Sequence, residues 1–113
     1  MKLVDIAAAL DCKPLTPLDG VGDIDTVVAS DGMSEILAFH SPGAVMLTGL
    51  TNIQSVRTAV VADVHAIIYV RGKQPPEAAR QLARDKGIPL FSTQLGMFES
   101  CGILYETGLK GAM

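Results

Sequence analysis

The first ten residues carry apolar side chains at the spacing of one helix face. The positions i, i+3, i+4 and i+7 are held by Leu3, Ile6, Ala7 and Leu10. This spacing predicts a helix that ends near Asp11. Prolines and glycines are frequent in the following stretch, from Lys13 to Asp25. We therefore expect turns there, around at most one short edge strand.

From Thr26 onward, short apolar runs alternate with helical patterns. The runs predict buried strands, because they are continuous and rich in branched residues rather than alternating with polar ones. They cover Thr26–Ala29, Ala44–Leu47, Ala66–Val70 and Ile88–Phe91. Between these strands we expect helices, one from Met33 to about His40, one that opens at Thr51, and one that starts with the prolines of Pro75-Pro76-Glu77 and finishes at Lys86-Gly87.

Polar residues next to these segments predict where the helices begin. Ser30 or Asp31 is expected to cap the helix at Met33, and Ser92 or Thr93 to cap the last helix. Thr51 to Gln54 has the T-x-x-Q form of a capping box. The residues expected to face inward are Ile36, Leu37, Ile53, Val56, Val60, Ala79 and Leu82, and along the last helix Leu95, Phe98, Gly102, Tyr105 and Leu109.

This alternation is typical of a small α/β domain with a mainly parallel sheet flanked by helices. Buried strands that are hydrophobic on both sides require helices on both faces of the sheet. The chain of 113 residues has the length of one ordinary domain, and neither a linker nor a convincing repeat interrupts it. We therefore expect residues 1–113 to form a single domain.

Composition excludes several classes of protein. The chain is 49% hydrophobic, which is too apolar for a disordered segment, and its net charge of −3 argues against binding nucleic-acid phosphates. With 4% aromatic residues and no Trp, a base-stacking surface is not indicated either. The apolar runs are far shorter than the ~20 residues that span a bilayer. The start of the chain has no signal-peptide pattern, so we expect a cytoplasmic location.

The motifs of nucleotide and metal sites are not matched. Gly20-Val21-Gly22 lacks the third glycine of the dinucleotide fingerprint, and Gly72-Lys73-Gln74 lacks the loop of a P-loop. His40 and His65 have no metal-ligand spacing. The two cysteines, Cys12 and Cys101, are far apart, so we expect unpaired thiols. We expect no metal and no cofactor.

Two enzyme-like alternatives are weaker than a binding role. In a phosphoacceptor receiver, Asp31 would need a lysine after the last strand, but Ser92-Thr93 stands there. A rhodanese-like thiol would need to follow a strand, whereas Cys101 is predicted in the middle of a helix. We therefore expect a protein that is not an enzyme.

Small polar residues gather where the predicted strands end. In a parallel sheet these ends share one edge with helix N-termini, which favour anions. The candidate ligand-binding residues are Ser30, Asp31, Thr48, Gly49, Thr51, Gly72, Ser92 and Thr93. Because the same residue types are ordinary helix caps, two interpretations remain open: capping alone, or a bound nucleotide or other small anion.

Two glycines, Gly96 and Gly102, fall in the predicted last helix. Each costs up to ~1 kcal/mol relative to alanine inside a helix. Their presence suggests close approach of another backbone, either that of the sheet or that of a second subunit.

Two segments carry a family resemblance. Ile67 to Pro75 is a strand that ends in glycine-x-x-Pro, and Gly87 to Thr93 reads G-I-P-x-x-S-T. With the opening helix, residues 25–31 and residues 52–66, these segments extend over nearly the whole chain. The sequence resembles the DRTGG domain family, which is similar to the amino-terminal domain of HPr kinase/phosphorylase. Arg71-Gly72 retains one glycine of the pair in the family's name.

The resemblance implies a regulatory module rather than a catalyst. Such domains occur in phosphotransacetylases and in pyrophosphatases with CBS domains, and also as short free-standing proteins. The P-loop domain that carries the kinase chemistry has no counterpart in this sequence. We therefore expect a regulatory or protein-interaction module that forms a homodimer, or that has a protein partner encoded nearby. The alternative is a domain that senses a nucleotide or another small anion.

Overall fold

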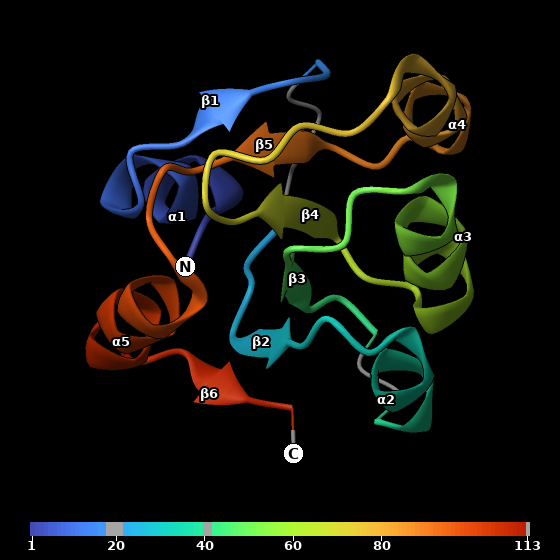
Figure 1. Ribbon diagram of the computed structural model, residues 1–113. Helices are drawn as coiled ribbons and strands as arrows, with labels where there is room; N and C mark the ends of the chain where they lie inside the picture. Colours follow the sequence, from blue (N-terminus) through green and yellow to red (C-terminus); the bar gives the residue numbers. More distant parts are fainter. Residues whose placement is uncertain (18–21, 40–41, 113) are drawn as a thin grey trace.

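The computed structural model describes residues 1–17, 22–39 and 42–112, and within these ranges the chain forms a six-stranded sheet with helices on both faces (Figure 1). The strands are β1 (Lys13–Pro14), β2 (Thr26–Ala29), β3 (Val45–Thr48), β4 (Ala66–Tyr69), β5 (Leu90–Ser92) and β6 (Lys110–Gly111). The helices are α1 (Leu3–Ala9), α2 (Met33–Ala38), α3 (Ile53–Ala62), α4 (Glu77–Lys86) and α5 (Met97–Glu106). The predicted α/β class is confirmed.

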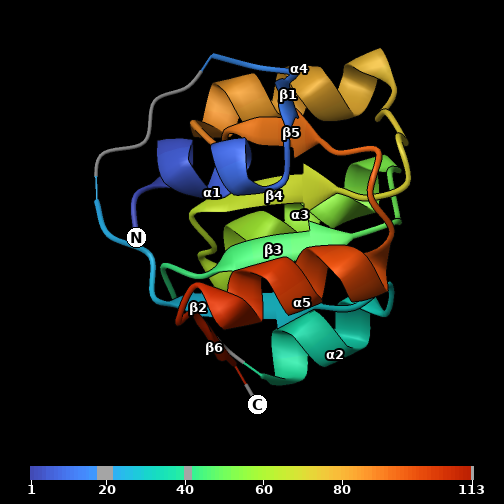
Figure 2. The same cartoon turned by 90° about the vertical axis from the view of Figure 1, so that its left-hand side faces the viewer.

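The order of the strands in the sheet is β1-β5-β4-β3-β2-β6. Strands β2 to β6 are parallel, and β1 pairs with β5 in the antiparallel direction. Helices α2, α3 and α4 lie on one face, whereas α1 and α5 cover the other (Figures 1 and 2). Because β2 to β5 run in the same direction, their carboxyl ends meet at one edge of the sheet.

Each face of the sheet has its own hydrophobic core. Met46, Ile67 and Tyr69 belong to the cluster that includes residues of α2, α3 and α4. Leu47 and Ile68 belong to the cluster with α1 and α5. With both faces covered, every residue of β3, β4 and β5 is buried, which explains their continuous apolar sequences.

Three residues of α5 that were expected to face inward are exposed, although Leu109 of the same expected stripe is buried. Phe98 is 89% exposed and Tyr105 is 77% exposed, and Gly102 between them is exposed as well. The side chains that α5 buries fully are Ser100 and Leu104. The prediction for Phe98, Gly102 and Tyr105 was therefore wrong, because it followed the largest side chains of the helix instead of the face next to the sheet.

Glycine, asparagine and proline, not hydroxyl or carboxylate side chains, occupy the N-cap positions of α2 to α5. These residues are Gly32, Asn52, Pro76 and Gly96, and none makes a side-chain cap hydrogen bond. The expected caps at Ser30 or Asp31 and at Ser92 or Thr93, and the capping box at Thr51, were therefore wrong. Ser92 instead continues β5, where it pairs with Tyr69.

Other details of the predicted helices also differ from the structure. Leu37 and Val60 were expected to face inward, yet both are exposed, since α2 and α3 bury Ile36 and Val56 instead. The glycine end of α4 is as expected: Gly87 has φ +69°, the left-handed conformation of a helix C-cap. The predicted helix end at His40, and Gly20-Val21, lie outside the described residues.

Candidate functional site

The carboxyl ends of β2 to β5 bring most of the predicted site residues to one edge. Backbone hydrogen bonds continue to this edge, because Ser30 N donates to Leu47 O at 3.1 Å and Thr93 N donates to Tyr69 O at 2.9 Å. Val70 N likewise donates to Thr48 O at 3.1 Å. The ends of neighbouring strands are therefore held side by side, as a site shared between them requires.

Asp31 and Arg71 link the ends of three strands at this edge. Asp31 Oδ1 accepts from Gly49 N at 2.6 Å and from the Thr48 hydroxyl at 3.4 Å, and its Oδ2 lies 3.7 Å from Arg71 Nη2. The Arg71 guanidinium lies against Gly49. A side chain at position 49 would therefore overlap it, already at its Cβ atom. The two side chains are 55% and 45% exposed, so the ion pair contributes about 0–1 kcal/mol.

Arg71 and Gly72 form the turn after β4. Their φ angles are +61° and +67°, and this left-handed conformation costs roughly 1–2 kcal/mol at a residue with a Cβ such as Arg71. Arg71 N donates to Leu95 O at 2.8 Å, and Gly72 N donates to Thr93 O at 2.7 Å. These amides therefore bind the loop after β5 and are not free to bind an anion.

Sequence reasoning missed Arg71, although its neighbour Gly72 was selected. The available signal was a basic residue next to a glycine at a predicted strand end. Its role depends on Asp31 and Gly49, however, which the fold alone brings beside it.

The hydroxyl groups at this edge also make hydrogen bonds to other groups of the same chain. The Ser92 hydroxyl donates to Lys73 O at 2.9 Å, and that of Thr93 donates to Leu10 O at 2.7 Å. The Ser30 hydroxyl accepts from Gly32 N at 2.9 Å and donates to Glu35 at 3.2 Å. Thr51 is half-buried just before α3. The structure thus favours a role for these residues in holding loops, and their predicted role in ligand binding stays a prediction.

A second candidate surface lies on α5, where three residues share one face. Phe98, Gly102 and Tyr105 are separated by four and three positions, which places them on one side of a helix. No atom outside the local chain lies within 4 Å of a Cβ added at Gly102, so this position is open. We call these three residues the aromatic face of α5.

A groove runs beside the aromatic face, between α5 and the outer strands β2 and β6. Its volume is about 190 Å³, and its lining is mainly apolar. The residues that line it are Val27, Val28, Ala29, Cys101, Leu104, Tyr105, Leu109, Lys110, Gly111 and Ala112. We call it the α5–β6 groove. Lys110 is the charged residue among the described residues that line it.

The close approach expected at the two glycines was wrong for the sheet. At Gly96, as at Gly102, a Cβ would meet nothing within 4 Å. The sheet lies on the opposite side of α5, where Ser100 and Leu104 are buried. The alternative, a second subunit, stays a prediction.

Both thiols are poor nucleophiles near neutral pH. Burial, reinforced by the negative charge of Asp11, raises the pKa of Cys12 to about 11. Burial also raises the pKa of Cys101. A thiol whose pKa is raised is almost entirely protonated at pH 7, and it is the thiolate that reacts. Cys12 and Cys101 form no disulfide, as expected.

Among the residues that the structure describes, the remaining titratable side chains form no second cluster with evident chemistry. In the part of the chain that the structure describes, no group of three or more His, Cys, Asp or Glu side chains gathers as metal ligands would. His65 lines a hollow of about 360 Å³ between the C-terminal ends of α3 and α4, together with Asp63 and Lys86. None of the described helices has the length and apolar character needed to cross a bilayer.

No protein-family model matches the chain, and no curated protein matches it. A solved structure is similar to it: the CBS and DRTGG domains of the regulatory region of Clostridium perfringens pyrophosphatase, in complex with the activator diadenosine tetraphosphate. The TM-score is 0.73 and the sequence identity 19%, over 90% of this chain and 45% of that one. The chain thus spans less than half the length of this relative, and the similarity is one of fold.

Proposed function

We propose that this protein is a non-catalytic regulatory module that acts as a homodimer, with α5 in contact between the two copies. The observation that carries the proposal is the exposure of Phe98 and Tyr105 on one face of α5. Adjacent exposed aromatic side chains mark interaction surfaces in soluble proteins. The resemblance to DRTGG domains, and the similarity in fold to a regulatory region, support the regulatory part of the proposal.

The spacing of the aromatic face supports a second copy of this chain as the partner. Phe98 and Tyr105 stand four residues before and three residues after Gly102. When two copies of α5 cross in antiparallel directions at Gly102, Phe98 of each copy lies near Tyr105 of the other. A twofold interface requires this reciprocity. The glycine lets the two helices approach closely, since it has no side chain between them.

The size of the aromatic face is compatible with a stable dimer. A Phe or Tyr side chain buries about 150–250 Å², and a specific interface buries about 1,200–2,000 Å² in total. Four aromatic rings from two copies therefore contribute on the order of half of a small interface. The remaining area comes from the surfaces around α5.

The contacts at the carboxyl ends of β2 to β5, which we call the strand-end edge, support the non-catalytic part of the proposal. The hydroxyls of Ser92 and Thr93 donate to backbone carbonyls, and Asp31 is held by Gly49 N and Arg71. An activated nucleophile needs a general base or a lowered pKa. Neither hydroxyl donates to such a base, and burial raises the pKa of both thiols.

Replacing Phe98 by aspartate is expected to raise the dimer dissociation constant at least tenfold, because a charge then replaces an aromatic ring at the centre of the contact. Sedimentation equilibrium of wild type and Phe98→Asp measures this directly. Phe98 is exposed, so the variant should keep the thermal unfolding of an isolated subunit.

The matched control is Val61→Asp, since Val61 is 68% exposed on α3, across the sheet from α5. This variant should dimerise like the wild type. A wild-type protein that stays monomeric at high micromolar concentration would overturn the proposed dimer.

A second candidate function is the sensing of a nucleotide or another small anion at the strand-end edge. The observation that favours it is Arg71, a half-exposed cation that Asp31 and Gly49 hold at the edge where α3 begins. The structurally similar regulatory region was crystallised with diadenosine tetraphosphate. In this alternative, Arg71 moves from Asp31 to a phosphate group.

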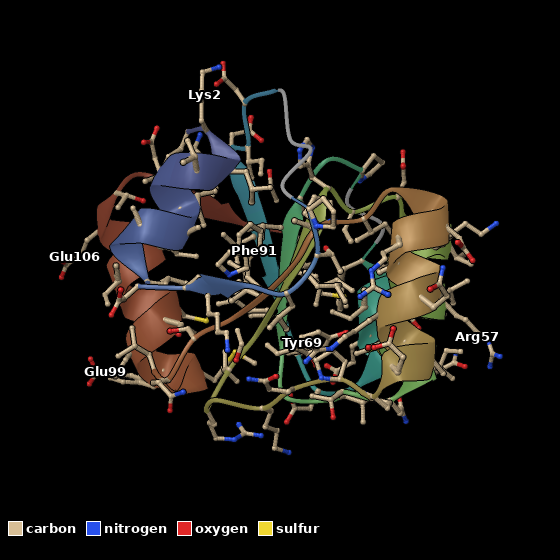
Figure 3. All side chains as sticks on the ribbon, turned by 90° about the horizontal axis from the view of Figure 1, so that it is seen from above. Lys2, Arg57, Tyr69, Phe91, Glu99 and Glu106 are labelled. Atoms are coloured by element: carbon tan, nitrogen blue, oxygen red, sulfur yellow. The ribbon has the colours of Figure 1, made fainter. Side chains whose placement is uncertain are left out.

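Thermal unfolding with added diadenosine tetraphosphate, ATP or AMP tests this second function. A ligand at about 100 times its dissociation constant adds ~2.7 kcal/mol to the stability of the folded state. The gain should be lost in Arg71→Gln and kept in Arg57→Gln, whose arginine points away from the sheet on α3 (Figure 3). The alternative fails if no nucleotide stabilises the wild type, or if both variants respond equally.

A further inference from the structure

We infer that Phe98 of each copy inserts its ring into the α5–β6 groove of the other copy. The inference rests on the proposed homodimer and specifies how its two surfaces meet. Phe98 is 89% exposed, so its ring does not fill the groove of its own subunit. The projecting ring and the groove lie next to each other, since Cys101 and Tyr105 of the same helix line the groove.

The groove has the size and the lining that a phenyl ring needs. Its volume is about 190 Å³, and an apolar cavity of about 150 Å³ is large enough to hold benzene. Tyr105 offers an aromatic edge and Cys101 a polarisable sulfur, both of which make favourable contacts with a ring. Val27 and Ala29 of β2 also line the groove.

Reciprocity selects a second copy over an unrelated partner. Each chain has the ring of Phe98 projecting from α5 and the α5–β6 groove beside the same helix. A twofold axis near Gly102 therefore brings the ring of either copy to the groove of the other, so that both are filled in one closed contact. An unrelated protein that filled the groove would leave Phe98 exposed.

The groove and the helix that bears the ring carry opposite charges. The groove has Lys110 at its rim, and Lys110 forms no ion pair with the described residues of its own chain. Helix α5 has two acidic residues, Glu99 and Glu106, and no basic one. Figure 3 shows both glutamates pointing away from the sheet. Insertion of the ring therefore brings an acidic helix toward the lysine-bearing groove of the other copy.

Disulfide trapping between two differently tagged chains tests the inference. The first chain carries Cys12→Ser and keeps its native Cys101 in the groove. The second chain carries Cys12→Ser, Cys101→Ser and Phe98→Cys, so its single thiol replaces the projecting ring. When the chains are mixed above the dimer dissociation constant and treated with a mild oxidant, we expect the cross-link between positions 98 and 101 to form at least tenfold faster than in the control.

The control replaces Phe98→Cys in the second chain by Val61→Cys, on the opposite side of the sheet. A cross-link between two copies of Phe98→Cys that dominates over the link to Cys101 would overturn the inference, because the rings would then face each other. Equal rates with the Val61→Cys control would also overturn it.

Sedimentation of the same chains before oxidation separates the two proposals. A dimer that gives no link between positions 98 and 101 contradicts the insertion of Phe98 but keeps the homodimer. A monomer contradicts both.

Discussion

Replacing Leu47 by alanine is expected to lower the free energy of unfolding by about 3–4 kcal/mol. Leu47 is fully buried in β3, between Ala29 of β2 and Ile68 of β4, and it contacts the core under α1 and α5. The substitution removes three buried carbons from a close-packed layer between a sheet and two helices. A cavity remains, because strands paired on both sides cannot move inward to fill it.

Urea denaturation at one fixed protein concentration measures this loss, since the proposed dimerisation would add a contribution to stability that depends on concentration. The matched control is Leu37→Ala on α2. Leu37 is 43% exposed, and alanine favours a helix, so its loss should stay below about 1 kcal/mol. If the two alanine variants lose the same stability, the layer between β3 and α5 is not packed as described.

Replacing Thr93 by valine is expected to lower the free energy of unfolding by about 2–3 kcal/mol. The Thr93 hydroxyl is buried, donates to Leu10 O at 2.7 Å and accepts from Leu95 N at 3.3 Å. Valine has nearly the same shape but leaves both backbone groups without this partner. The variant thus tests whether the residue holds the end of α1 to the loop after β5.

Comparison with Thr93→Ser isolates the hydroxyl in this experiment. Serine keeps the hydroxyl and loses one methyl group, so we expect a loss of only about 1 kcal/mol. Equal stability of Thr93→Val and the wild type would contradict the structural role and restore ligand binding as the explanation for this hydroxyl.

The inner strands were predictable from local sequence because side chains on both of their faces are buried. Runs such as Ala66–Val70 are buried on both faces, so their residues need no alternation and are recognised by composition alone. The two outermost strands gave weaker signals. Lys13–Pro14 was covered by the expectation of a short edge strand, whereas Lys110–Gly111 was missed, since two exposed residues have no apolar pattern.

The orientation of α5 and the contacts of the candidate site depend on distant parts of the chain. Leu104 faces the sheet and Phe98 does not, yet both are large and apolar, so spacing alone could not decide between them. Thr93 was selected as a cap, but its hydroxyl binds Leu10, which lies 83 positions earlier. The sequence predicted that polar residues gather at the strand ends, but not which of their groups are already occupied.

The two edges of the sheet limit the ways in which copies of this protein can assemble. The strand at each edge has only two residues. Strand β1 contains Pro14, which has no N–H to donate, and β6 consists of Lys110 and Gly111. Such short, charged edges discourage the addition of a neighbour's strand. In the homodimer that we propose, the exposed face of α5 is buried in both chains, so no copy of it is left to bind a third chain. Under the proposed pairing, we therefore expect concentrated protein to form closed pairs and not to extend into fibrils.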